Sequence, residues 1–398
     1  MSRLERIELF HVDMPLAEPF WPSWIPGYPQ THNRFTLIRL TTDDGLTGVS
    51  AGAAFTTERQ GLGDLLGGFL LGLDPMDIAT VRQRIKEASY LGWRNWWIEP
   101  AFWDLRGKIE GRPVYQLLTG SDARVEKVPC YASTGSLRSF DERKPYLDDI
   151  REKGFRGVKI RVHSFDEEED FEILRRVREE VGAEFQVMVD ANQGWRVTLI
   201  DDAPLWDLER ATRFGRVADE LRFAWIEEPL DMHRFDEYAE LRRRIETPIA
   251  GGELFGSRQE MRTALDKGAF DILQPDATFA GGSKTGDGPL PNAWSAASVI
   301  HPIRGRTASV CSLTCTSRPR RGRTIFWNIR MSHRVGLLKD ATVFWRRLSV
   351  LTAKAPSPVP QAPGLGILLD DRKVSRFARR FHLMTPSRLA VKTIREKD

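Results

Sequence analysis

The chain has 398 residues, of which 41% are hydrophobic and 29% are charged, as is typical of a soluble globular protein. This length exceeds what one small core organises, so we expect two domains, or one large barrel with an added lobe. No apolar run approaches the roughly 18 residues of a membrane helix, so the sequence predicts no membrane-spanning helix, and we expect no membrane partner. The first residues alternate as in a strand and lack the layout of a secretory signal, so we expect a cytoplasmic protein.

The net charge of +4 hides a local basic block. Residues 284–356 hold thirteen Lys or Arg residues and two acids, a net charge of +11. The remaining residues hold 46 basic and 53 acidic side chains, a net charge of −7. A strongly basic segment therefore interrupts an acidic protein.

Residues 1–125 are predicted to form an α+β lobe. The segment IELFHVDMPL is typical of a strand, and RFTLIRLTTDDGLTGVSAG of a hairpin with an Asp-Asp-Gly turn. Apolar residues at helical spacing predict helices in DPMDIATVRQRIKEASY and in EPAFWDLRGKIEGRPVYQLLTG, the second interrupted at Gly111 and Pro113.

Short Val/Ile-rich strands then alternate with amphipathic helices. The predicted strands are VPCYAS, GVKIRVH, FQVMVDAN, FAWIEEPL, PIAGGEL and FDILQPD. This alternation predicts parallel βα units. The polar residues at the strand ends follow one another at intervals of 23 to 37 residues, about one unit each, and are Lys159, Asp190, Glu227, Glu253 and Asp276. We expect them to gather at the carboxyl-terminal rim of a barrel.

Three carboxylates stand at the ends of consecutive predicted strands: Asp190 in VMVDANQGW, Glu227 in WIEEPL and Glu253 in IAGGEL. Oxygen ligands from three strands suit Mg²⁺, which keeps waters and accepts substrate oxygens. Any one of these acids alone is more simply explained by solvation or helix capping. Three at matching positions favour a metal site.

Taken together, these motifs resemble the enolase superfamily, in the mandelate racemase/muconate lactonizing enzyme family and its mandelate racemase-like branch. The resemblance covers EPAFWDLRGKIEGRPVYQLLTG and the strand motifs to about residue 282. It implies an α/β fold, a modified (β/α)7β TIM-type barrel over residues 126–360. An α+β capping domain, residues 1–125, would cover the barrel, and residues 361–398 would return to that cap.

The resemblance also implies that Asp190, Glu227 and Glu253 bind Mg²⁺, while Glu228 and Asn192 lie behind these ligands or contact the substrate. The implied reaction removes the proton beside the carboxylate of a small acid, in a racemase or in a dehydratase of hydroxy acids or acid sugars. Bound Mg²⁺ would offset the charge that develops on the carboxylate, and a Lys or His would act as the base. Many members are oligomers, so we expect a homo-oligomer.

The residues at the position of the base depart from the family pattern. Lys159, Arg161 and His163 share one face of a strand by its period of two. The family has Lys-x-Lys here, with the second lysine as base, but an arginine has a pKa above about 12 and accepts a proton poorly. Arg161 would instead hold a substrate carboxylate beside Lys159. For His163, a surface position at the strand end is the favoured interpretation.

Asp276, in DILQPDATFAGG, fits the aspartate of an Asp–His dyad that the resemblance implies, with helix capping as the alternative. The histidine should follow about 25 residues later in a Pro-His-x-Trp stretch, and that stretch does not appear. The alternative function is therefore an impaired or inactive family member that keeps the metal site and lacks the His base. Because that histidine often supplies the acid of a dehydratase, racemase and dehydratase are not separated.

Residues 284–356 are predicted to be encoded out of frame. Codons permitted from His301 onward give Pro-His-Thr-Trp when the frame is shifted by two bases, and Phe326 to His333 permit Leu-Glu-Tyr-Pro-Tyr-Glu-Pro. Both stretches are family-like, which indicates either a sequencing error or a real pair of compensating shifts. The seventh and eighth barrel units would then be disrupted. Since the shifted frame also explains the arginines between residues 318 and 323, we expect no nucleic-acid partner.

An early loop of the cap, EPFWPSWIPGYPQTHNRF, would close over the substrate in this family. Trp24 and Tyr28, with Trp21 and Asn33, are the candidates for that contact. Aromatic packing within the loop itself is an equally good interpretation of these residues.

Resequencing of the gene across codons 280 to 360 tests the shifted frame. We expect a corrected reading that restores Pro-His-Thr-Trp, or a verified pair of compensating shifts. A verified frame without such shifts, together with eight regular barrel units, would contradict the prediction.

Overall fold

The computed structural model describes residues 2–53, 62–92, 94–128, 131–282, 300–303, 306–310, 315–316 and 357–395. The segment predicted to be out of frame, residues 284–356, therefore lies outside the described residues except for three short strands. The frame prediction stays a prediction.

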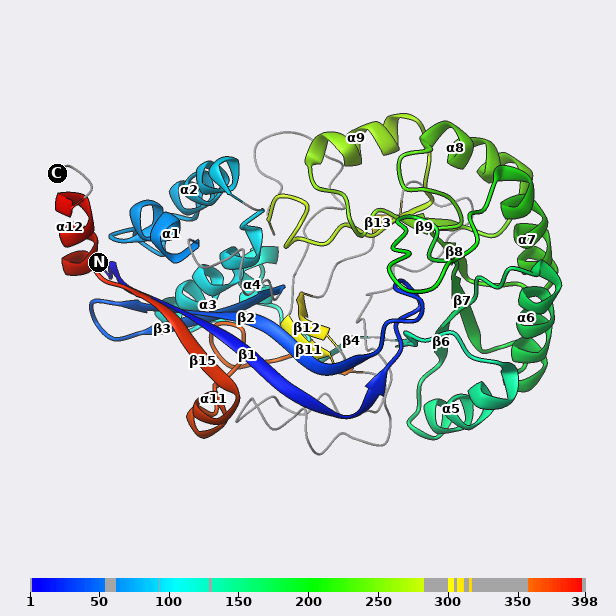
Figure 1. Ribbon diagram of the computed structural model, residues 1–398, viewed down its shortest axis with the longest axis horizontal. Helices are drawn as coiled ribbons and strands as arrows, with labels where there is room; N and C mark the ends of the chain where they lie inside the picture. Colours follow the sequence, from blue (N-terminus) through cyan, green and yellow to red (C-terminus); the bar gives the residue numbers. More distant parts are fainter. Residues whose placement is uncertain are drawn as a thin grey trace.

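One end of the molecule is an antiparallel sheet in the order β15-β1-β2-β3, packed against helices (Figure 1). The expected hairpin forms between β2 and β3, where Gly45 takes the positive φ of 84° that its turn requires. The elements of this cap are β1 (Leu4–Phe20), β2 (Gln30–Thr42), β3 (Thr47–Ala53), α1 (Leu62–Leu70), α2 (Ile78–Leu91), η1 (Trp96–Ile98), α3 (Glu99–Glu110), α4 (Val114–Thr119), α11 (Asp371–Phe377), β15 (Ala378–Met384) and α12 (Pro386–Arg395).

The other end is a sheet in the order β13-β10-β9-β8-β7-β6-β5, with helices around its outer side (Figure 1). Strands β5 to β10 are parallel, whereas β13 pairs antiparallel with β10. The elements at this end are β5 (Ala132–Ser133), α5 (Phe140–Glu152), β6 (Gly157–Arg161), α6 (Glu167–Val181), β7 (Gln186–Asp190), α7 (Leu208–Glu220), β8 (Trp225–Glu227), α8 (Phe235–Arg244), β9 (Ile249–Gly251), α9 (Arg258–Asp266), β10 (Ile272–Leu273) and β13 (Cys315–Thr316). Two further pairs of strands form separate sheets: β4 (Lys127–Val128) with β14 (Ser357–Pro358), and β11 (Ile300–Ile303) with β12 (Arg306–Val310), which contacts β2 and β3.

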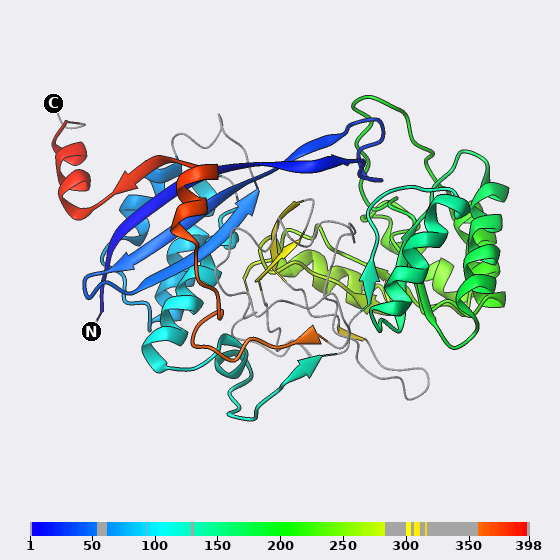
Figure 2. The same ribbon diagram turned by 90° about the horizontal axis from the view of Figure 1, so that it is seen from below.

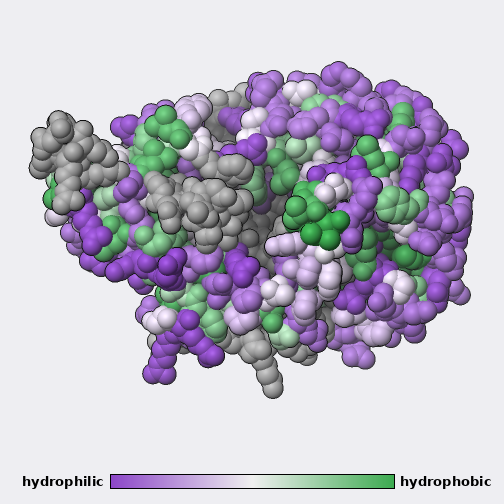
Figure 3. Space-filling view, in the orientation of Figure 1, coloured by the Kyte–Doolittle hydropathy of each residue, from purple (hydrophilic) through white to green (hydrophobic). Residues whose placement is uncertain are grey.

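Strand β6 is buried along its whole length, because helices cover one face of the sheet and the barrel interior the other. Val158 and Ile160 belong to the hydrophobic core of the barrel. By the alternation of a strand, Lys159 and Arg161 point to the opposite, interior face. On the solvent side, the surface over the outer helices is mainly hydrophilic (Figure 3).

The hairpin of β1 and β2 is longer than the cap needs, and its tip reaches across to the barrel (Figure 2). The chain between the two strands there forms backbone hydrogen bonds to barrel residues, from Ser23 to Gly135 and from Asp201 to Pro26. In the described ranges no helix has the length and hydropathy that a membrane span requires.

Asp104 of α3 ties three parts of the cap together. Its carboxylate, fully buried, accepts hydrogen bonds from the backbone of Val49 at 3.1 Å and of Leu365 at 2.9 Å, and it pairs with Lys108 at 2.7 Å. Burial raises the pKa of Asp104, and the nearby ammonium of Lys108 opposes that rise. The segment after residue 361 is thereby anchored on the cap, while the predicted boundary at residue 125 stays a prediction.

Asp104→Ala should lower the free energy of unfolding by about 3 kcal/mol, because it leaves two backbone donors and one ammonium without their buried acceptor. Urea denaturation of the two proteins measures the difference. The control is Asp371→Ala, since the side chain of Asp371 is 84% exposed and lies 3.7 Å from Arg39. The control should change stability by less than about 0.5 kcal/mol, and equal effects of both variants would contradict the role of Asp104.

Candidate active site

The predicted site residues come together at the carboxyl ends of the parallel strands. Arg161, Asp190 and Glu227 are register partners on β6, β7 and β8, so their Cα atoms lie at one level of the barrel. Lys159 lies two residues earlier on β6, and Glu253 follows β9 by two residues. Lys159, Asp190, Glu227 and Glu253 thus lie at one end of the strands, where their spacing in the sequence led us to expect them, while their roles stay a prediction.

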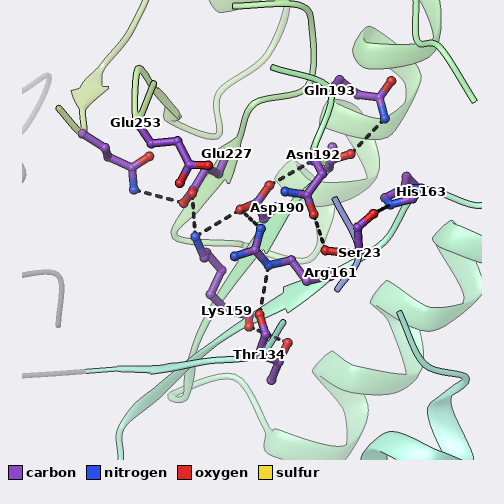
Figure 4. Close-up of polar contacts among 12 residues, drawn as sticks. Ser23, Thr134, Lys159, Arg161, His163, Asp190, Asn192, Gln193, Glu227 and Glu253 are labelled. Atoms are coloured by element: carbon purple, nitrogen blue, oxygen red, sulfur yellow. Dashed lines mark hydrogen bonds and ion pairs between the residues drawn. The ribbon is translucent and has the colours of Figure 1, made fainter. Parts of the chain in front are cut away.

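Two buried cations pair with the carboxylates, and one of them, Lys159, bridges two (Figure 4). The Nζ atom of Lys159 lies 3.1 Å from Oδ2 of Asp190 and 2.5 Å from Oε1 of Glu227. Arg161 pairs with the same oxygen of Asp190, and its Nε donates to the carbonyl of Thr134 at 2.9 Å. Since these four charged side chains are no more than 3% exposed, their attraction is little screened by water.

Glu228 adds a further carboxylate to this cluster. The residue is buried with a φ of 47°, and neither of its carboxyl oxygens has a hydrogen-bond partner in the part of the chain that the structure describes. Burial raises the pKa of Glu228 well above its usual value, and the charges of Glu253, Asp190 and Glu227 raise it further. Burial also raises the pKa of Asp190 to about 6, against the opposing charge of Arg161.

The charges of the cluster do not balance when its acids are ionised. Glu253 is half-buried and accepts a hydrogen bond from Nε1 of Trp195 at 3.1 Å. Asp190, Glu227, Glu228 and Glu253 carry four negative charges, and Lys159 and Arg161 carry two positive ones. A divalent cation would neutralise the difference, and hard carboxylate oxygens suit Mg²⁺. In the described ranges no three acidic, His or Cys side chains are grouped closely enough to hold one metal ion, and the ammonium of Lys159 stands between Asp190 and Glu227.

Asp276 follows β10, and its Oδ1 accepts hydrogen bonds from the backbone N and the Oγ1 of Thr278, both at 2.7 Å. This is a local turn contact, and no helix begins there, so helix capping is not what these bonds do. Since the sequence lacks the expected Pro-His-x-Trp stretch, the catalytic role of Asp276 stays a prediction.

The tip of the β1–β2 hairpin lies over the site and corrects one prediction. We expected His163 at the surface, but its side chain is buried, because Ser23 of the hairpin covers it and places a carbonyl oxygen 2.9 Å from Nε2. The hydroxyl of Ser23 donates to Oδ1 of Asn192 at 2.6 Å, and the backbone N of Asn192 donates to Asp190 at 2.9 Å. The hairpin thus contacts the carboxylate cluster through one serine (Figure 4).

Among the aromatic residues of the hairpin, Trp24 is buried, with its ring 5.6 Å from the guanidinium carbon of Arg161. Tyr28 and Trp21 are 43% and 53% exposed, and Asn33 is buried. Trp24 is therefore the aromatic residue of this loop that adjoins the cluster. Sequence reasoning missed Ser23, since nothing in its neighbourhood distinguishes it from an ordinary loop serine.

Comparison with known proteins matches both halves of the chain. Residues 7–119 match the family model of the mandelate racemase / muconate lactonizing enzyme N-terminal domain, and residues 146–286 that of the enolase C-terminal domain-like family. An L-talarate/galactarate dehydratase of Salmonella typhimurium is 31% identical over 296 residues, which are 71% of either chain. A D-galactarolactone cycloisomerase of Agrobacterium fabrum is 32% identical over 258 residues, 62% of this chain and 64% of the relative.

Among solved structures, the Salmonella typhimurium L-talarate/galactarate dehydratase liganded with Mg and L-lyxarohydroxamate is similar to this chain. The two superpose with a TM-score of 0.71 at 25% sequence identity, over 96% of this chain and 94% of the other. The likeness therefore extends over cap and barrel alike.

His163 should make stability depend on pH. Burial lowers its pKa, the carbonyl group of Ser23 opposes this, and the charges of Arg161 and Arg210 lower it further. The unfolded chain then binds the proton more readily than the folded one, so this contribution to stability is lost as pH falls below about 6.5.

Urea unfolding at pH 7.5 and pH 5 measures this dependence against His163→Gln, which has a neutral amide there. We expect the free energy of unfolding to fall more for the wild type than for the variant between the two pH values. The contributions of the acids that both proteins share cancel in this comparison. Equal losses would contradict a lowered pKa of His163.

Proposed function

The chain belongs to the mandelate racemase/muconate lactonizing enzyme family of the enolase superfamily, and on this premise we propose how its residues carry out the chemistry of that family. It is an enzyme of the mandelate racemase type that depends on Mg²⁺ and removes the α-proton of a carboxylate substrate, as a racemase or an acid-sugar dehydratase. The comparisons give no support to the alternative of an inactive member.

One observation carries the assignment of residues: a buried cluster with four carboxylates and two cations at the ends of β6 to β9. We assign Asp190, Glu227 and Glu253 as the residues that hold Mg²⁺. The ion would supply Lewis acidity, offsetting the charge on the substrate carboxylate as the α-proton leaves. Glu228, directly after Glu227 and without a hydrogen-bond partner in the described chain, would favour a cation nearby when ionised.

Lys159 and Arg161 have different tasks in this proposal. Because a guanidinium is a poor proton acceptor in general, we assign Arg161 to orienting a carboxylate rather than to taking the proton. Lys159 can release its proton and accept another, and its Nζ already lies among the proposed ligands. The ring of Trp24 covers the guanidinium of Arg161 and limits access of water to it. Asp276 remains a candidate partner for a second acid or base.

The relatives suggest the substrate class. Two of them are named for galactarate, L-talarate or a galactarolactone, which are six-carbon acid sugars or their lactone. We propose an acid sugar as the substrate and dehydration as the reaction to test first. We also propose a homo-oligomer, with small carboxylates as the partners of the site.

Glu227→Gln tests the assignment. The enzyme with Mg²⁺ should exchange the α-proton of galactarate for deuterium in D₂O, as followed by NMR, and chelation of the metal should stop the exchange. The substitution removes one negative charge and the partner of Lys159, so the rate should fall by about 100-fold or more.

The matched control is Glu240→Gln on the exposed face of α8, where Glu240 pairs with Arg243 and Arg244. This variant should keep the wild-type rate. Exchange in Glu227→Gln at the rate of the control would overturn the assignment of the metal ligands.

A further inference from the structure

A small cavity lies beside the carboxylate cluster, where the hairpin tip meets the loops after β6 and β7. Its volume is about 10 Å³, enough for about one water-sized group. Residues of the hairpin and of both loops line it, among them Ser23, Trp24, His163, Asn192, Gln193 and Trp195. Asn192 also donates its backbone N–H to Asp190, so the cavity adjoins a proposed metal ligand.

The argument for a ligand rests on two of the lining side chains, His163 and Asn192. His163 is 5% exposed and Asn192 is 7% exposed, and within the described chain neither Nδ1 of His163 nor Nδ2 of Asn192 has a hydrogen-bond partner. The neighbouring polar groups are engaged elsewhere, since Gln193 bonds to Ala191 and to Trp206, and Trp195 donates to Glu253. Leaving two buried polar atoms unpaired costs free energy, which indicates that a further group belongs in the cavity.

The contacts with the hairpin determine whether each of these two atoms donates or accepts a hydrogen bond. A carbonyl oxygen only accepts hydrogen bonds, so Nε2 of His163 must donate its proton to Ser23. In the neutral ring Nδ1 is then an acceptor, and the lowered pKa of His163 favours that neutral form. On Asn192 the oxygen Oδ1 accepts from the hydroxyl of Ser23, which leaves the amide Nδ2 as a donor. The cavity therefore offers one acceptor and one donor.

We propose that this cavity is a subsite for one hydroxyl group of the substrate, and that His163 determines specificity for acids that carry it. A hydroxyl both donates and accepts, and so matches Nδ1 of His163 and Nδ2 of Asn192 at once. A carboxylate cannot donate to Nδ1, and an ammonium cannot accept from Nδ2. The inference rests on the proposed function, because the hydroxyl group belongs to the acid that binds at the carboxylate cluster.

Two variants separate recognition from the contact with the hairpin. A glutamine at position 163 reaches the place of Nε2 and keeps a donor for Ser23, but it has no acceptor at the place of Nδ1. An asparagine at position 163 has an acceptor near Nδ1 and loses the bond to Ser23. His163→Gln should therefore lose hydroxyl recognition, and His163→Asn should retain it.

The experiment is calorimetric titration in Mg²⁺ buffer, which reports binding apart from turnover. The probes are galactarate, each of its monodeoxy analogues, and adipate, the same diacid without hydroxyls. The wild type should bind one monodeoxy analogue about 10- to 100-fold more weakly than galactarate. His163→Gln should abolish that difference and leave the ranking of the other analogues unchanged, and His163→Asn should keep it.

The proposal would be overturned if His163→Gln bound that monodeoxy analogue more weakly than galactarate by the same factor as the wild type. It would also be overturned if the wild type bound galactarate no more tightly than adipate. Either result would mean that the cavity holds a structural water. Failure of the proposed function would give a different result. If the wild type binds galactarate more tightly than the monodeoxy analogue but exchanges no α-proton, the hydroxyl subsite is supported and only the proposed reaction is contradicted.

Discussion

The site depends on the burial of like charges. Asp190 and Glu227 are register partners on neighbouring parallel strands, and Glu228 follows directly, so all three lie at the same strand ends, where water cannot screen them. Lys159 and Arg161 offset only part of this charge. In the proposed assignment a divalent ion would complete this cluster, while β6 to β9 fix the backbone from which each side chain projects. The same uncompensated charge that costs stability would then give the site its affinity for a cation.

The tip of the β1–β2 hairpin covers the site and contacts the barrel residues around the carboxylate cluster. Ser23 bonds to His163 with its carbonyl and to Asn192 with its hydroxyl, and Trp24 packs over Arg161. Loop and cluster are thus joined by a chain of short contacts rather than by a broad apolar surface. A few directional hydrogen bonds can break and re-form as a substrate enters, whereas a large hydrophobic interface resists opening.

The sequence predicted the parts of this protein that depend on local pattern. Strand periodicity placed Lys159 and Arg161 on the interior face, and the intervals between βα units placed Asp190, Glu227 and Glu253 at one rim. It failed for His163, whose burial depends on Ser23, 140 residues away. It also gave no sign of the antiparallel pairing of β13, because strand direction depends on tertiary contacts. Local periodicity predicts helices and strands, but it does not indicate which distant segment of the chain will cover a given side chain.

Asp104 and the pairing of β15 with β1 have a consequence for how the protein is made. Strand β1 pairs with β2 early in the chain, but its other edge finds its partner β15, and Asp104 its donor Leu365, only near the far end of the sequence. On the ribosome, β5 to β10 can pair with their neighbours as each emerges, whereas that edge of the cap sheet stays unpaired. The strands that position the proposed metal ligands can therefore pair before the cap sheet is complete.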